Sequence, residues 1–151
     1  MSDELNELYQ QVILDHSRKP RNFHVLPEAN RSAEGNNPLC GDHFTVFLKL
    51  ENGVIKDISF QGAGCAISKA SASMMTDQLK GKTVEEAGKT FAQYQQMVTT
   101  GPTDEASLGK LCVFSGVRQF PMRVKCAILP WHAMMAGLNG QAMVSTDESK
   151  S

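Results

Sequence analysis

The stretch that decides the fold is Phe44–Phe60, with the sequence FTVFLKLENGVIKDISF. Apolar side chains occupy every second position of its first half, at Phe44, Val46, Leu48 and Leu50. A period of two indicates a strand with one buried face. Asn52-Gly53 is a tight-turn pair, and apolar residues return at Val54, Ile58 and Phe60. The stretch therefore predicts an antiparallel β-hairpin.

Helical patterns flank this hairpin on both sides. Apolar residues at helical spacing, a capping box at Thr83–Glu86 and a segment rich in Ala, Ser and Met predict helices over residues 3–16, 66–79, 84–98, 104–117 and 126–137. The last of these is predicted to begin near Cys126 and not at Met122, because Pro130 is tolerated in a first turn but costs about 3 kcal/mol deep inside a helix. Gly and Pro make residues 17–39 a predicted loop.

The order of elements predicts an α+β fold, a small antiparallel sheet with helices packed mainly on one face. The length of 151 residues suits one domain, over residues 1–144, followed by a polar, disordered tail over 145–151.

Composition narrows the class of function. The formal net charge is -1 and no long basic run occurs, which argues against nucleic-acid or membrane-surface binding. There is no apolar run of the eighteen or so residues that a transmembrane helix needs. The acidic start, Met1-Ser2-Asp3-Glu4, is unlike a signal peptide, so we expect a cytoplasmic protein. In that compartment scattered cysteines indicate metal-binding, catalytic or buried thiols and not disulfides.

Three cysteines fall at the boundaries of predicted elements, where their side chains can converge on one end of the sheet. They are Cys40 in NPLCGD (37–42), Cys65 in GAGC (62–65) and Cys126 in RVKC (123–126). Together with Asp42 they can complete a tetrahedral metal site. A hard carboxylate among three thiolates leaves such a site adjustable, which favours chemistry at the metal over a structural staple.

Each of these residues also has a plainer interpretation. Cys40 can be an incidental thiol in a turn, and Cys65 and Cys126 can be small core residues. Asp42 can simply bond its own loop, and His43 is a rival ligand, since neutral imidazole binds zinc well.

The surroundings of two thiols favour the thiolate form. A predicted helix N-terminus at Cys65, and the cations Arg123 and Lys125 beside Cys126, both stabilise a thiolate. The fourth cysteine, Cys112, lies mid-segment among apolar residues and is predicted to be a buried structural thiol.

The three cysteine motifs, in this order, resemble those of the IscU/NifU-type iron–sulfur cluster assembly proteins. The resemblance rests on NPLCGD (37–42), GAGCAIS (62–68) and Lys125-Cys126, with further similarity at Leu8-Tyr9, Asp15-His16 and Pro20-Arg21-Asn22. It extends over residues 5–140 or so. It implies that Cys40, Asp42, Cys65 and Cys126 bind one Zn²⁺, with Asp42 and not His43 as the fourth ligand.

Two features are similar to the SufU branch of that family. Lys125 precedes the last cysteine where the IscU branch has a histidine, and residues 84–118 look like an insertion of the SufU branch. This resemblance implies a zinc-dependent sulfurtransferase, a persulfide carrier and not a stand-alone enzyme. Its partners would be a SufS-type cysteine desulfurase, which it stimulates, and downstream SUF cluster-assembly proteins. Cys40 would accept the persulfide sulfur, and Arg123 is a candidate to stabilise the thiolate or the persulfide anion.

Two other functions use the same residues. One is a scaffold on which an iron–sulfur cluster or iron is held transiently, since cluster ligation also uses Cys thiolates. The other is a zinc-stapled interaction module without chemistry of its own.

Overall fold

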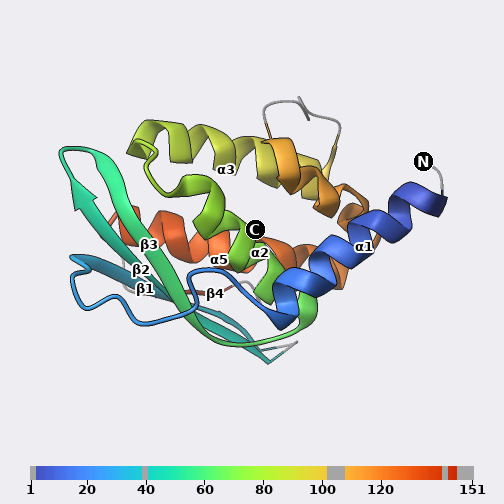
Figure 1. Ribbon diagram of the computed structural model, residues 1–151, viewed down its shortest axis with the longest axis horizontal. Coiled ribbons are helices and arrows are strands. Elements are labelled where there is room, and N and C mark those ends of the chain that lie inside the picture. Colours follow the sequence, from blue (N-terminus) through green and yellow to red (C-terminus); the bar gives the residue numbers. More distant parts are fainter. Residues whose placement is uncertain (1–2, 39–40, 102–107, 141–142, 146–151) are drawn as a thin grey trace.

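The computed structural model describes residues 3–38, 41–101, 108–140 and 143–145. A four-stranded sheet in the order β3-β2-β1-β4 carries helices on one side (Figure 1). The elements are α1 (Asp3–Arg18), β1 (Arg31–Asn37), β2 (Asp42–Glu51), β3 (Val54–Ala63), α2 (Ala66–Leu79), α3 (Val84–Thr99), the 3₁₀ helix η1 (Gly109–Gln119), α5 (Pro121–Leu138) and β4 (Met143–Ser145). The α+β class predicted from the sequence is confirmed. No helix among the described residues is long and apolar enough to cross a membrane.

The predicted hairpin is confirmed as β2 and β3. The strands pair antiparallel, with Val46 opposite Phe60 and Leu48 opposite Ile58. Asn52 and Gly53 turn the chain with φ values of +54° and +75°, as a tight hairpin turn requires. The alternating side chains of β2 point into the helices and are fully buried at Phe44, Val46 and Leu48.

The prediction of a loop over residues 17–39 is wrong for β1. This strand pairs antiparallel with β2 and parallel with β4. Its inward positions are Ala33, Gly35 and Asn37, which are small or polar and give no hydrophobic alternation. The reason is α5, which packs on this strand: a Cβ atom added to Gly35 would lie 3.0 Å from Leu129 Cδ1 and 3.2 Å from Ala133 Cβ.

The predicted helices α1, α2 and α3 are present. At the start of α3 the capping box is complete, because Glu86 N–H donates to Thr83 Oγ1 (3.0 Å) and Thr83 N–H donates to Glu86 Oε1 (2.9 Å). Within the segment predicted as a helix over 104–117, residues 102–107 lie outside the described residues. The described remainder forms mainly the 3₁₀ helix η1, which begins at Gly109 with φ +57°.

The predicted start of the last helix is wrong. Helix α5 begins with Pro121, at a position where a missing N–H costs nothing, and Pro130 lies in its interior. Cys126 is therefore in the second turn and not at the helix start. Because Pro130 has no N–H to donate, the Cys126 carbonyl receives no helical hydrogen bond from it.

Contacts from two other helices hold α5 in place next to Cys126. The Ala127 carbonyl accepts hydrogen bonds from Ser71 Oγ of α2 (2.6 Å) and Tyr94 OH of α3 (2.9 Å). Trp131 Nε1 donates to the same Ser71 Oγ (3.2 Å), and its ring stacks on Tyr94 with centroids 4.6 Å apart. This buried network fixes α5 relative to α2, which begins directly after Cys65.

Candidate metal centre

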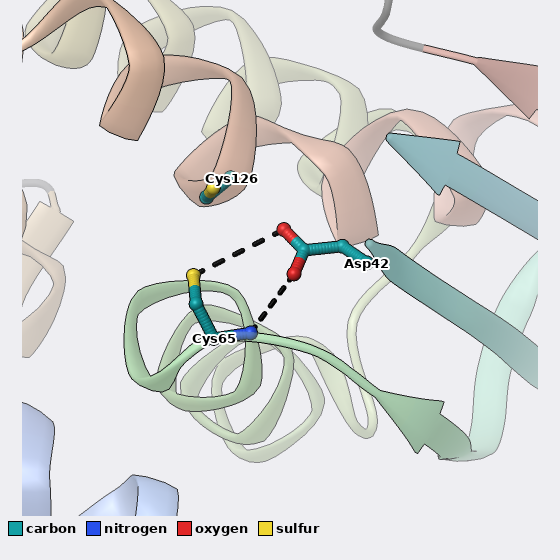
Figure 2. Close-up of side chains that lie close together, drawn as sticks. All are labelled: Asp42, Cys65 and Cys126. Carbon is teal, nitrogen blue, oxygen red and sulfur yellow. Dashed lines mark hydrogen bonds between the residues drawn. The ribbon is translucent and has the colours of Figure 1, made fainter. Parts of the chain in front are cut away.

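Three metal-ligating side chains from separate parts of the chain meet at one end of the sheet. Asp42 begins β2, Cys65 precedes α2 and Cys126 lies in α5. Their ligand atoms all lie within 4.8 Å of one another, and they form the one such group found in the part of the chain that the structure describes (Figure 2). Two thiols and a carboxylate at this separation suit a divalent metal ion with soft and hard ligands.

Asp42 is a buried carboxylate, with a residue exposure of 2%. Its Oδ1 accepts the Cys65 N–H at 2.8 Å, which ties the start of β2 to the start of α2 (Figure 2). Gly64 permits this approach. A Cβ atom there would lie 2.5 Å from Asp42 Oδ1 and 2.7 Å from Ser68 Oγ. The residue before Cys65 must therefore lack a side chain.

Cys65 is the N-cap residue of α2 and is half-buried. Its Sγ accepts the Ser68 N–H (3.5 Å) and lies 3.6 Å from Ser68 Oγ. Its pKa is lowered from 9.0 to about 5, first by a hydrogen bond from the Cys126 thiol and then by Ser68, against burial and the Asp42 charge. As a thiol, Cys65 instead donates to Asp42 Oδ2 at 3.9 Å. The arrangement thus favours the thiolate, which is the metal-binding form.

Cys126 differs from Cys65 in being fully buried. Asn37, at the end of β1, donates its Nδ2 hydrogen toward Cys126 Sγ at 3.9 Å. Cys126 lies in the second turn of α5 and not at the helix start. The contacts at its sulfur come from the neighbouring Cys65 thiol and from the Asn37 amide.

Cys40, the remaining predicted ligand, lies outside the described residues. Of its neighbours, Gly41 has φ +72° and donates its N–H to the Pro38 carbonyl (3.3 Å). Asp42 follows directly. The role of Cys40 as metal ligand and sulfur acceptor stays a prediction.

The structure separates the two rival ligands Asp42 and His43. Successive residues of a strand point to opposite faces. Asp42 accordingly faces the two cysteines, whereas His43 is exposed on the open face of the sheet. There its Nε2 pairs with Glu34 Oε1 (3.1 Å) and its Nδ1 with Asn36 Oδ1.

Cys112 takes no part in the group of ligand atoms. It lies in η1 and packs against the core, but it is half-buried, not fully buried as predicted.

Arg123 lies one turn before Cys126 in α5 and is exposed. It lines a groove of about 560 Å³ whose other walls include Tyr9 and Ile13 of α1, Ile67 of α2 and Phe120. Ile67 follows Cys65 by two residues, but Asp42, Cys65 and Cys126 themselves do not line the groove. That Arg123 stabilises a persulfide stays a prediction.

Sequence reasoning assigned no role to three residues of this site: Asn37, Gly64 and Ser68. Ser68 carried a usable signal, since the residue three positions after an N-cap commonly donates its N–H to the cap. Asn37 carried none, because its partner is 89 positions away.

Comparisons with known proteins show the family of the chain. Residues 8–127 match the family model of the NifU-like N-terminal domain. The chain is 42% identical over 135 residues to the zinc-dependent sulfurtransferase SufU of Bacillus subtilis (strain 168), covering 89% of this chain and 91% of that protein. It is 37% identical over 131 residues to the iron–sulfur cluster assembly scaffold protein IscU of Thermotoga maritima, covering 87% and 92%.

Solved structures show the same fold. A crystal structure of a candidate iron–sulfur cluster assembly scaffold protein for the SUF system, from Fervidobacterium islandicum AW-1, superposes with a TM-score of 0.82. It is 35% identical, and the match covers 88% of this chain and 98% of that chain.

Fold and site together define a small α+β protein that gathers thiols and a carboxylate at one end of its sheet. The chain belongs to the NifU-like N-terminal domain family, with relatives in both the SufU and the IscU groups.

Proposed function

We propose that this protein is a zinc-dependent sulfur acceptor in iron–sulfur cluster assembly. It takes persulfide sulfur from a SufS-type cysteine desulfurase and stimulates that enzyme. The observation that carries the proposal is the meeting of Asp42, Cys65 and Cys126 at one point. The similarity to a zinc-dependent sulfurtransferase over 89% of the chain supports it.

The donor set fits zinc. Two thiols and a carboxylate lie within 4.8 Å of one another, and Cys65 favours the thiolate. With Cys40 as fourth ligand the set is the Cys3Asp arrangement that the sequence predicts. When bound, Zn²⁺ keeps such thiols deprotonated near neutral pH and does not change oxidation state. Three thiolates, one carboxylate and Zn²⁺ sum to a formal charge of about -2.

Cys40 is the proposed acceptor of sulfur. Its thiolate attacks the outer sulfur of the cysteine persulfide on the desulfurase. A new S–S bond forms on Cys40, the S–S bond of the donor breaks, and the donor cysteine leaves as a thiolate with the electron pair. One persulfide and one thiolate enter and leave, so no oxidant, reductant or proton is needed.

In the proposed reaction, the positive charge of Arg123 stabilises negatively charged sulfur. Arg123 is exposed, lies one turn before Cys126 in α5 and lines the groove. A cation there offsets part of the negative charge of the ligands and of a persulfide anion. We assign it that stabilising role. The protein that takes the sulfur next belongs to the SUF cluster-assembly proteins, and the reaction takes place in the cytoplasm.

The test is desulfurase turnover, read as alanine release from cysteine by a SufS-type enzyme. Wild-type protein should stimulate turnover, and Cys40→Ala protein should not. Cys112→Ala is the matched control, because Cys112 lies apart from the ligand group, and it should stimulate like wild type. Stimulation by Cys40→Ala equal to wild type would sink the proposal.

A scaffold role is the second candidate, favoured by the IscU scaffold proteins among the relatives. Thiolates at the same positions would then hold an iron–sulfur cluster as cargo. Metal analysis of freshly purified protein separates the two functions. Stoichiometric zinc supports sulfur transfer, and a visible cluster that can be passed to an acceptor protein supports the scaffold.

A zinc-stapled interaction module without chemistry makes a different prediction. Folded Asp42→Ala protein would then stimulate the desulfurase like wild type. Under the proposed function it should not.

A further inference from the structure

We infer that Asn37 is a positioning residue that holds the Cys126 sulfur, through its side-chain amide, in the orientation in which it binds metal. This inference rests on the metal centre of the proposed function. It concerns a residue that is not itself a ligand.

Strand register places Asn37 beside the candidate metal centre. Asn37 is the last residue of β1 and pairs with Asp42 across the antiparallel ladder. Directly opposed residues of a ladder point to the same face of a sheet. The Asn37 amide and the Asp42 carboxylate are accordingly both buried on the face that α5 covers.

The packing of α5 on β1 brings Cys126 to the same place. α5 and β1 are in contact and run antiparallel to each other. Near the end of α5, a Cβ on Gly137 would lie 3.8 Å from Ala33 Cβ. In its middle, Leu129 and Ala133 lie against Gly35. The next inward position of the strand is Asn37, and the next residue along that stripe of the helix is Cys126. The small residues Ala33 and Gly35 thus set the close approach that lets a short amide reach the sulfur.

The amide itself is an unusual group to bury at this position. Its Nδ2 hydrogen is directed at Cys126 Sγ (3.9 Å), and its Oδ1 is buried with no hydrogen-bond partner among the described residues. Buried polar groups are nearly always paired, so an unpaired amide oxygen calls for a functional reason. An apolar residue at the end of β1 would avoid that unpaired oxygen. The gain from keeping the amide is the donor to sulfur.

The chemistry of metal thiolates explains the gain. A hydrogen bond to a ligating sulfur fixes the direction of its lone pairs and offsets part of the negative charge of the ligand set. Partners of this kind typically change metal affinity by about 10–100-fold when they are removed. Ser68 does the same for Cys65, through its N–H and Oγ. Asn37 is the corresponding partner of Cys126.

The test compares neighbouring asparagines. Asn37→Val removes the donor and the unpaired oxygen together. Asn36→Val makes the same change one residue earlier, where the side chain points to the open face of the sheet and pairs with His43. Zinc affinity is measured by competition with a chromophoric chelator. The Co²⁺-loaded proteins give the sulfur-to-cobalt charge-transfer spectrum, and urea unfolding gives the stability of the metal-free proteins.

We expect Asn37→Val to bind zinc about 10–100-fold more weakly and to show a shifted charge-transfer band. The metal-free variant should be no less stable than wild type. Asn36→Val should leave both affinity and spectrum unchanged. Wild-type affinity and an unshifted band for Asn37→Val would overturn the inference. So would an affinity loss matched by an equal loss of metal-free stability.

A second variant decides the matter if Asn37→Val does not fold. Asn37→Asp keeps the shape of the side chain and replaces the donor by a carboxylate, so the same loss of affinity is expected, with Asn36→Asp as its control. The inference and the proposed function can fail separately. Wild-type-like zinc binding by both Asn37 variants would refute the positioning role of Asn37 and leave the proposed function intact. Tight zinc binding by wild type without sulfur uptake at Cys40 ends only the proposed function.

Discussion

Cys65 and Cys126 belong to one group of ligand atoms but are held by different means. Cys65 is half-buried at a helix N-cap, and apart from the Cys126 thiol its donors come from Ser68, three residues away. Cys126 is fully buried in the second turn of a helix, and its amide donor, Asn37, comes from the distant strand β1. The Cys65 side of the site is therefore local, whereas the Cys126 side depends on how α5 packs against β1, α2 and α3.

The largest expected loss of stability and of zinc binding comes from a substitution beside Cys65. Gly64→Ala places a methyl group 2.5 Å from Asp42 Oδ1 and 2.9 Å from a Phe44 ring carbon, so something must move. We expect overpacking to cost about 3 kcal/mol of unfolding free energy and to abolish tight zinc binding. Urea unfolding and chelator competition measure the two. Gly88→Ala in α3 is the control: its Cβ meets nothing within 4 Å, so it should stabilise by about 0.5–1 kcal/mol. Equal stability of the two variants would contradict this description of Gly64.

The next largest effect is expected from a substitution that weakens the packing of α5 near Cys126. Tyr94→Phe removes a hydroxyl that donates to the Ala127 carbonyl (2.9 Å) and contacts Ser71 Oγ (3.0 Å). In a buried site we expect a loss of about 1–2 kcal/mol in unfolding free energy. Zinc affinity should fall as well, because Ala127 follows Cys126. Tyr9→Phe, on the half-buried groove side of α1, should change stability by less than about 0.5 kcal/mol. A Tyr94→Phe protein as stable as Tyr9→Phe would show that the network does not hold α5.

A smaller loss of zinc affinity is expected from removing the Ser68 hydroxyl next to Cys65. Ser68→Ala removes the hydroxyl 3.6 Å from Cys65 Sγ but keeps the backbone donor. Zinc affinity should therefore fall by about tenfold, at the low end for such partners. Chelator competition measures it, with Ser17→Ala in α1 as control. A drop as large as that expected for Asn37→Val at its upper limit would mean that the two thiols are not held differently.

The smallest effect concerns pH. Burial lowers the pKa of His132, on α5, below its usual 6.5, and its ring packs edge-on against Phe91 at 5.3 Å. A histidine whose pKa is lowered by folding contributes stability above the unfolded pKa, and this stability is lost as pH falls through the folded value. Metal-free protein should thus lose stability below about pH 6.5, with a slope from this group of at most about 1.4 kcal/mol per pH unit.

Urea titrations of metal-free wild type and His132→Gln between pH 7.5 and 5 measure this slope, a range chosen to span about one unit on either side of the usual histidine pKa. The variant should show the shallower dependence. Identical slopes would mean that His132 contributes nothing to it.

Local patterns predicted much of this fold. The alternation over β2, the Asn52-Gly53 turn and the capping box at Thr83 each depend on residues close in sequence, and all three are confirmed. The prediction of β1 failed because its inward residues were selected by the close approach of α5, which no local pattern records. The start of α5 was misplaced for a similar reason. Pro130 is tolerated inside the helix in a region that Ser71, Tyr94 and Trp131 hold together.

The candidate site divides in the same way. The cysteine motifs and the family resemblance that they carry were enough to indicate Asp42, Cys65 and Cys126, and the structure brings these three together. Between Asp42 and His43 the residues alone left the choice open, and the direction of β2 places Asp42, not His43, beside the two cysteines. Asn37 could not be assigned, because its role exists only once β1 and α5 are packed together.

Sulfur transfer to Cys40 is tested most directly by locating the transferred sulfur. Zinc-loaded protein is incubated with a SufS-type cysteine desulfurase and cysteine, trapped with an alkylating reagent, and digested for mass spectrometry of the cysteine-containing peptides. We predict a persulfide on Cys40 and none on Cys112. A persulfide found on Cys65, Cys126 or Cys112 with Cys40 unmodified, or no persulfide on any of the four, would contradict the account.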